Sequence, residues 1–209
     1  MNNFDSIIFD VDGTMWDSTE VAADAYNEVF EREGMDIRVT GNDLKKLFGK
    51  PMDVIFQTIL PDIDHETAVR LGNECMDLEN KTLAKTGADY YPEIVETFRA
   101  LSSKIPVFIV SNCQCGYIEV VMHGAHLEPY VTDHLCFGDT GTSKGQTIRT
   151  LMKKYGLKHS VYVGDIQGDA DACEEAGIPV IYAAYGFGTI REPYAVIHEL
   201  KELRTLFDC

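Results

Sequence analysis

Hydrophobic residues follow two patterns along the second half of the chain. From residue 91 onward, short unbroken apolar runs alternate with stretches in which apolar residues recur every three or four positions. The first pattern is typical of buried strands and the second of amphipathic helices. Strands are predicted at 105–110, 133–137, 161–163 and 180–183, and helices at 92–101, 118–123, 143–155, 169–176 and 193–206. Repeated β-α units of this kind predict a parallel sheet with helices on both faces.

The segment Ser6–Phe9 is a further predicted strand, and it runs directly into Asp10, Asp12 and Gly13. Carboxyl ends of strands in open α/β sheets line the crevice where ligands bind. Asp10 and Asp12 are two positions apart, so along an extended backbone their side chains leave on the same side. Two carboxylates this close repel each other unless a cation or a proton separates them.

Between these two regions lie about seventy residues that predict helices and no convincing strand. Helices are expected from residue 18 to about 33, near 43–48, at 52–60, and from 64 to about 84. Asp17-Ser18 and Asp64 supply residues that favour helix starts, and Gly34 and Gly87 favour helix ends. A chain of 209 residues can hold one main core and a smaller satellite unit.

The negative net charge of the chain argues against polyanionic partners. The chain carries 34 acidic and 18 basic residues and a formal net charge of −16. Binding to DNA, RNA or an anionic membrane requires basic patches, so none of these is an expected partner. An anionic substrate would instead need local cations, such as a metal ion and a lysine.

The termini and cysteines suggest a compartment. The first residues include Asn2, Asn3 and Asp5 instead of a basic and then apolar leader, and no apolar run approaches the roughly 20 residues of a membrane span. The six cysteines form no CxxC pair, so we expect reduced thiols and a cytoplasmic protein. Cys113 and Cys115 have the wrong spacing for a zinc knuckle or a thioredoxin-type pair, and we interpret them as packing or incidental residues.

Four short motifs stand in a defined order. Asp10–Thr14 reads DVDGT, Ser111-Asn112 follows a strand, Lys144 opens a helix, and Gly164–Asp169 reads GDIQGD after another strand. Together they resemble the four signatures of the haloacid-dehalogenase-like (HAD) superfamily. The resemblance implies a Rossmann-like α/β core at residues 1–15 and 85–209, with an inserted α-helical cap at 16–84. The segment Tyr185–Gly188 further resembles the phosphoglycolate-phosphatase-like subgroup.

The resemblance also implies roles for the acidic residues and the lysine. Asp10 would be the nucleophile that forms an aspartyl-phosphate, and Asp12 the general acid and base. Mg²⁺ would be the cofactor, held by side chains of Asp10 and Asp165 and by the backbone carbonyl of Asp12. Asp169 would be a further acidic residue of the metal site, and whether it touches the metal or orients Lys144 is open. Lys144 would balance the charge that develops on the phosphoryl group.

Four other residues are candidate substrate contacts. Ser111 and the backbone amide of Asn112 would hold the phosphoryl oxygens. The segment Leu47–Pro51 resembles a substrate-specificity loop, in which Lys50 is either a contact for an acidic head group or an ordinary surface lysine. Trp16 either lines the cleft near the hinge or packs in the core.

These features predict a phosphoric monoester hydrolase that acts on a small phosphorylated metabolite, either phosphoglycolate-like or a sugar phosphate. Dehalogenating relatives lack the second aspartate, so Asp12 favours a phosphate ester as substrate. Two alternatives stay open: a phosphosugar mutase of the β-phosphoglucomutase type, and a non-catalytic protein that binds a phosphorylated ligand. A phosphonatase is less favoured, because Lys45, Lys46 and Lys50 are unspecific candidates for its Schiff-base lysine. The oligomeric state is not encoded in any visible pattern.

Overall fold

The computed structural model of the protein describes residues 4–50 and 52–209, and its core is a six-stranded sheet. Its strands are β1 (Ser6–Phe9), β4 (Val107–Ser111), β5 (Asp133–Cys136), β6 (Ser160–Gly164), β7 (Val180–Ala183) and β8 (Ala195–Ile197). Their order across the sheet is β5-β4-β1-β6-β7-β8, and every neighbouring pair is parallel. The predicted α/β class with a parallel sheet is therefore confirmed.

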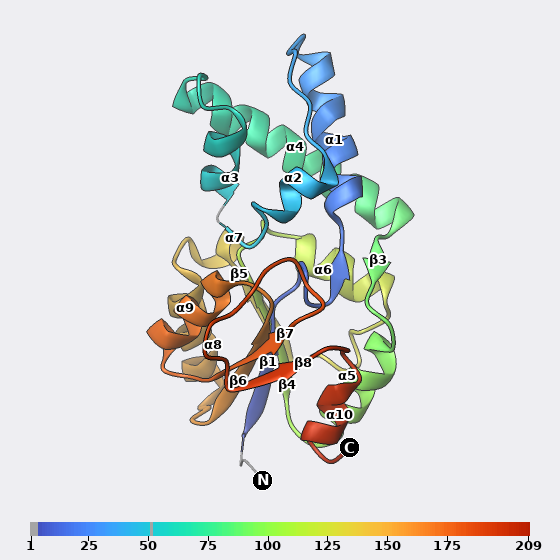
Figure 1. Ribbon diagram of the computed structural model, residues 1–209, viewed down its shortest axis with the longest axis vertical. Coiled ribbons are helices and arrows are strands. Elements are labelled where there is room, and N and C mark those ends of the chain that lie inside the picture. Colours follow the sequence, from blue (N-terminus) through green and yellow to red (C-terminus); the bar gives the residue numbers. More distant parts are fainter. Residues whose placement is uncertain (1–3, 51) are drawn as a thin grey trace.

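Helices cover both faces of this sheet (Figure 1). Ile7 and Phe9 of β1 pack on the side of α5 (Ile94–Ser102), α6 (Tyr117–Gly124) and α10 (Glu202–Leu206). Ile8 points to the other side, where it joins residues of α8 (Lys144–Tyr155) and α9 (Gln167–Ala176). Burial on both faces explains why the strands read as unbroken apolar runs with no polar alternation.

The strand order creates a switch point at the centre of the sheet. β1 pairs with β4 on one side and with β6 on the other. The chain segments that follow these three strands therefore diverge from one another at the carboxyl end of β1 and leave a crevice between them. Open α/β sheets bind ligands in such a crevice. Asp10, Ser111 and Asp165 all lie at this edge.

The helices described between β2 and β3 form a second layer beyond the carboxyl edge of the sheet, at the top of Figure 1. They are α1 (Thr19–Arg32), α2 (Gly41–Lys45), α3 (Met52–Ile59) and α4 (His65–Thr86). Their inward faces share an apolar core that includes Tyr26, Phe30, Phe56 and Leu71. The inserted helical unit is thus present, because its helices bury their apolar faces mainly against one another.

A short antiparallel pair, β2 (Trp16–Asp17) and β3 (Asp89–Tyr90), joins the chain where it enters and leaves the helical unit. The sequence predicted no strand here, because two residues are too few to establish a period. The domain boundaries expected at residues 16 and 84 stay a prediction, and they fall close to this pair.

Two other expectations are wrong in detail. Residues 193–206 are not one helix: Ala195–Ile197 forms β8 at the edge of the sheet, and only Glu202–Leu206 is helical. The predicted strand at 133–137 ends at Cys136, and Phe137 begins the one-turn helix α7 (Phe137–Thr140). No helix within residues 4–50 and 52–209 is both long and apolar enough to cross a membrane.

Candidate active site

Lys144 links two of the carboxylates that the motifs single out. Its Nζ donates hydrogen bonds to Asp10 Oδ1 at 3.0 Å and to Asp169 Oδ1 at 2.7 Å. All three side chains are almost completely buried. Ser143 caps α8, and this fixes the first turn of the helix from which Lys144 reaches the end of β1.

The charges of this cluster do not balance. Asp10, Asp165 and Asp169 each offer a carboxylate oxygen, and these atoms all lie within 4.8 Å of one another. Burial raises the pKa of Asp10, while the Lys144 ammonium acts in the opposite direction. Burial and the charges of Asp169 and Asp10 likewise raise the pKa of Asp165 well above its usual range. Burial acts to lower the pKa of Lys144, but the two carboxylates outweigh it and raise that pKa, so Lys144 stays protonated.

Asp165 lies between the DVDGT segment and Phe187. Its Oδ1 accepts from the Thr14 hydroxyl at 3.3 Å, and its Oδ2 accepts from the Phe187 amide at 2.7 Å. Gly13 has φ +77°, and a Cβ there would lie 2.1 Å from Asp165 Oδ2. The glycine of the DVDGT motif therefore makes room for the first acidic residue of the GDIQGD motif.

Asp169 has little capacity left for a metal ion. Its Oδ1 accepts from Lys144, and its Oδ2 accepts from the backbone amides of Asp165 and Ile166 at 3.0 and 3.1 Å. This geometry favours a role in holding Lys144 and the turn after β6. Direct contact between Asp169 and a metal stays a prediction.

Asp12 is oriented by three donors that converge on one oxygen. Its Oδ1 accepts from Tyr117 Oη at 2.6 Å, Ser18 Oγ at 2.9 Å and Trp16 Nε1 at 3.1 Å. Burial raises the pKa of Asp12, and these three hydrogen bonds act against that rise. Within residues 4–50 and 52–209, the recorded hydrogen bonds to the Asp12 carboxylate all end on Oδ1, which leaves Oδ2 for another partner.

Of the two expectations for Trp16, the structure places the side chain in the core. Its side chain is fully buried, and its ring packs against Tyr90 at 5.3 Å and Tyr117 at 5.5 Å between centroids. Trp16 donates to Asp12 and connects it to the β2–β3 pair. The indole is therefore a positioning group for Asp12.

Ser111, Asn112 and Lys50 meet at the boundary between the sheet and the helical unit. They line a cavity of about 20 Å³ together with Asp12 and Glu79. The Asn112 side chain donates to the Gly49 carbonyl at 2.8 Å, so the loop after β4 directly contacts the helical unit. Lys50 is exposed, and Pro51 lies outside the described residues. A volume of 20 Å³ is room for about one water molecule.

Comparison with known proteins shows the family of the chain. A family model described as haloacid dehalogenase-like hydrolase matches residues 7–183. The chain belongs to the haloacid dehalogenase-like hydrolase family. A phosphoglycolate phosphatase of Photorhabdus laumondii is 25% identical and covers 87% of this chain and 81% of its own. That of Escherichia coli is 23% identical, covering 97% of this chain and 93% of its own.

Solved structures show the same fold at lower sequence identity. A haloacid dehalogenase-like family protein, SP0104 of Streptococcus pneumoniae, has a TM-score of 0.84 at 20% identity and covers 98% of each chain. CbbY of Rhodobacter sphaeroides, solved with xylulose-(1,5)bisphosphate, has a TM-score of 0.83 at 16% identity and covers 96% of each chain. The family model and the phosphoglycolate phosphatase relatives confirm the expected family and the expected enzyme class, a phosphoric monoester hydrolase.

Sequence reasoning missed Glu79 in this haloacid dehalogenase-like hydrolase. It lies on α4, is 2% exposed, lines the same cavity as Asp12 and accepts a 3.0 Å hydrogen bond from Tyr26. Burial, assisted by the charge of Asp12, raises the pKa of Glu79 to about 8. A glutamate in the middle of a charged helix gives no sequence signal, because such residues usually face solvent.

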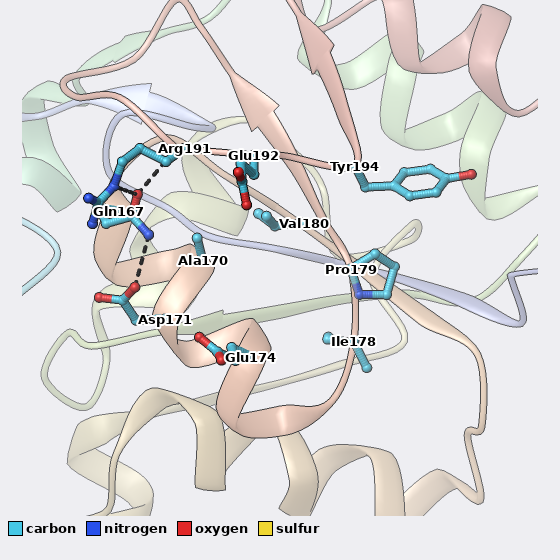
Figure 2. A pocket seen from close by; sticks show the side chains of 10 residues that line it. All are labelled: Gln167, Ala170, Asp171, Glu174, Ile178, Pro179, Val180, Arg191, Glu192 and Tyr194. Atoms are coloured by element: carbon cyan, nitrogen blue, oxygen red, sulfur yellow. Dashed lines mark hydrogen bonds between the residues drawn. The ribbon is translucent and has the colours of Figure 1, made fainter.

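A second cavity of about 690 Å³ lies beside α9 (Figure 2). Gln167 holds one wall through hydrogen bonds with Asp171 and with the Arg191 backbone amide. The lining includes Asp171 and Glu174 beside Arg191, but none of the residues predicted to carry the chemistry. Asp171 is exposed, as expected for a helix residue outside the site.

Proposed function

We propose that this hydrolase is a Mg²⁺-dependent phosphatase that cleaves a small phosphorylated metabolite through an aspartyl-phosphate on Asp10. The observation that carries the proposal is the buried arrangement in which Lys144 bridges Asp10 and Asp169, with Asp165 beside them. Burying three carboxylates with one ammonium is costly unless protons or a second cation join them. A structural role alone does not account for that cost.

The donor set fits Mg²⁺. Asp10, Asp165 and the backbone carbonyl of Asp12 would hold the ion, because Mg²⁺ prefers oxygen ligands and commonly binds through one or two carboxylates and a substrate phosphate. When bound, the ion would neutralise negative charge on the phosphate and on the nucleophile. Asp169 would serve the site through Lys144, since both of its oxygens already accept hydrogen bonds.

In the first half of the reaction, a carboxylate oxygen of Asp10 would attack phosphorus. Lys144 bonds to Asp10 Oδ1, so Oδ2 is the oxygen available for attack. As the new bond forms, the bond between phosphorus and the ester oxygen breaks, and Asp12 donates its proton to the departing alkoxide. Ser111, the Asn112 amide and Lys144 would hold the phosphoryl oxygens in line with Asp10.

In the second half, the roles reverse. The Asp12 carboxylate takes a proton from water, whose oxygen attacks phosphorus and releases the Asp10 carboxylate and inorganic phosphate. Tyr117, Ser18 and Trp16 hold Asp12 Oδ1 throughout, so Oδ2 carries the proton in both directions. General acid–base catalysis of this kind contributes about 10²–10⁴-fold to a rate.

The phosphoglycolate phosphatase relatives and the sugar bisphosphate in the CbbY structure support two substrate types. The cavity of about 20 Å³ at the boundary between the sheet and the helical unit is smaller than either of them. The helical unit would move away from the sheet to admit a substrate. Lys50 would lie at the entrance, where it could contact an acidic head group.

The test is hydrolysis of p-nitrophenyl phosphate by the purified full chain. We expect phosphate release with Mg²⁺, loss of activity with a chelator, and a fall of about 10³-fold or more in Asp10→Asn. Asp171→Asn is the matched control, since this exposed aspartate lies on the neighbouring helix α9 outside the site. Full turnover by Asp10→Asn would exclude the proposed nucleophile.

A further inference from the structure

Three cysteines gather near Ser111 and Asn112, and none of them has a role in the proposed reaction. Cys113 and Cys115 lie in the loop after β4, and Cys136 is the last residue of β5. Parallel pairing places Cys136 opposite Ser111, so two segments more than twenty residues apart in sequence meet here. Sequence spacing concealed the cluster, because the third thiol comes from another strand.

Asp139 on α7 connects two of these thiols. Its Oδ1 accepts from Cys115 Sγ at 3.6 Å, and its Oδ2 accepts from Cys136 Sγ at 3.2 Å and from the Cys136 amide at 2.8 Å. One ligand atom from each of Cys115, Cys136 and Asp139 lies within 4.8 Å of the other two. These separations resemble the edges of a tetrahedral zinc site, where sulfur and oxygen ligands are about 3.5 Å apart.

The backbone holds the three groups in this arrangement. The Gly138 amide donates to the Cys113 carbonyl at 3.1 Å, which docks the turn of α7 on the loop after β4. A Cβ at Gly138 would lie 2.5 Å from the Cys115 amide nitrogen and 2.8 Å from its sulfur. The glycine therefore permits the close approach that brings Cys115 next to Asp139, and no large movement is needed to converge the ligands.

We propose that Cys115, Cys136 and Asp139 form a binding site for a thiophilic divalent cation of the Zn²⁺ class. Two thiolates and a carboxylate supply three ligands, and exposed Cys115 and Asp139 leave the fourth position to water. Each thiol loses its proton to solvent as its sulfur binds the ion, so binding releases up to two protons.

This site would select a different ion from the carboxylate cluster at the end of β1. Thiolates bind soft and borderline cations, whereas Mg²⁺ prefers oxygen ligands and retains its waters. A cation on the thiols would tie the turn after β5 to the loop that carries Ser111 and Asn112. The proposal does not depend on the proposed phosphatase activity, since it concerns other residues and another metal.

Cobalt(II) titration of the reduced, full-length protein tests the site. Co²⁺ replaces Zn²⁺ and gives a thiolate-to-metal absorption band in the near ultraviolet, which carboxylate ligands do not produce. The titration uses excess Mg²⁺ to occupy the oxygen-rich site and a phosphine reductant to prevent disulfides. We expect the band to saturate at one Co²⁺ per chain and to disappear when Zn²⁺ is added.

Matched variants locate the ligands. Cys115→Ser and Cys136→Ser should each lose the band, and Asp139→Asn should weaken Co²⁺ binding by at least about tenfold. Cys209→Ser removes a partly buried thiol near the C-terminus and should leave the band unchanged. Circular dichroism checks the fold of each variant, and exposed Cys115 is the substitution least able to disturb it. A folded wild-type protein without the band, or a band that survives Cys115→Ser, would overturn the proposal.

Discussion

The Tyr117 hydroxyl donates a 2.6 Å hydrogen bond to Asp12, although the two residues are 105 positions apart in the chain. Tyr117 is the first residue of α6, and its ring is buried against Trp16. Ser18 Oγ lies 2.8 Å from the same hydroxyl and also donates to Asp12. Asp12, the proposed general acid, is thus held by Tyr117 of α6, which packs on the sheet, and by Ser18 at the start of the helical unit.

Tyr117→Phe tests this support. In the wild type, the hydrogen bond from Tyr117 favours the charged form of Asp12. Its removal in Tyr117→Phe should therefore raise the pKa of Asp12 further. We expect kcat/KM to fall about tenfold, because hydrogen bonds to charged groups contribute about 1.5–3 kcal/mol. The alkaline limb of the kcat/KM profile, where Asp12 loses its proton, should move to higher pH.

Tyr155→Phe is the control for that variant. Its hydroxyl also donates to an aspartate, Asp133 at 2.9 Å, but on the surface and away from the site. Tyr155→Phe should leave the pH dependence of kcat/KM unchanged. Identical profiles for Tyr117→Phe and wild type would mean that the Tyr117 hydroxyl does not tune Asp12.

Lys144→Met should destabilise the fold as well as abolish activity. The substitution leaves Asp10 and Asp169 buried without their cation, which costs about 3–5 kcal/mol of unfolding free energy. The loss should shrink at lower pH, because Asp10, whose pKa burial raises to about 7, then takes up a proton. Urea unfolding in the presence of a chelator, at about pH 5.5 and about pH 7.5, measures both effects.

Lys154→Met provides the comparison on the same helix. Lys154 pairs with Asp133 at 2.6 Å, but its side chain is 55% exposed. Exposed pairs contribute at most about 1 kcal/mol, so this loss should be small and nearly independent of pH in that range. Equal losses for the two variants would contradict the electrostatic account of the buried cluster.

Glu79→Gln should flatten the dependence of stability on pH. The pKa of Glu79 rises from its ordinary value of 4.5 to about 8 on folding, so the folded chain binds the proton more tightly. This contribution to stability is complete below pH 4.5 and is lost as the pH rises through 8. Between about pH 5.5 and about pH 8, wild type should therefore lose about 3 kcal/mol more than Glu79→Gln.

Urea unfolding at several pH values gives the comparison, and Glu66→Gln supplies the reference. Glu66 lies on the same helix α4 but is exposed, so its substitution should retain the wild-type pH dependence. A Glu79→Gln curve parallel to wild type would show that Glu79 does not gain its proton on folding.

Gly49→Ala should impair the closed state. Gly49 has φ +86°, and a Cβ there would lie 2.3 Å from Ile166 Cδ1 in the GDIQGD motif. The added methyl group would push the loop of Gly49 and Lys50 away from the sheet. We expect kcat/KM to fall by about tenfold or more, because small displacements of positioning groups have effects of up to about 10².

Gly34→Ala separates backbone strain from this contact. Gly34 has φ +71°, but a Cβ there meets nothing within 4 Å. It carries a similar conformational penalty, of the order of 1 kcal/mol, without touching the site. Steady-state kinetics of both variants should show an effect on turnover in Gly49→Ala only, and equal kinetics would exclude a role for the Gly49 contact.

The sequence alone determined the parallel sheet and the edge of the sheet at which the four motifs meet. Unbroken apolar runs such as Ile105–Val110 are strong signals, because a strand buried on both faces tolerates no polar alternation. The four ordered motifs placed Asp10, Ser111, Lys144 and Asp165 at strand ends and a helix start, and β1, β4, β6 and α8 bring them to one edge.

Three short strands, β2, β3 and β8, were beyond sequence reasoning. The β2–β3 pair has two residues in each strand, and β8 was hidden in a segment that also fits a helix. Their formation depends on partners distant in the chain: Trp16 pairs with Tyr90, and Ile197 with Ala183. Local periodicity contains no information about such partners.

Only the tertiary structure decided the hydrogen-bond partners and the burial of each site residue. The sequence could not show that Trp16 orients Asp12, that both Asp169 oxygens are already used, or that Glu79 is buried beside Asp12. Nor could it bring Cys136 to Cys115, since their proximity follows from strand register and not from spacing. Sequence motifs identify the chemical groups of the site. Their hydrogen-bond partners and their burial arise only when segments distant in the chain pack together. Those partners and that burial set the charge and the orientation of each group.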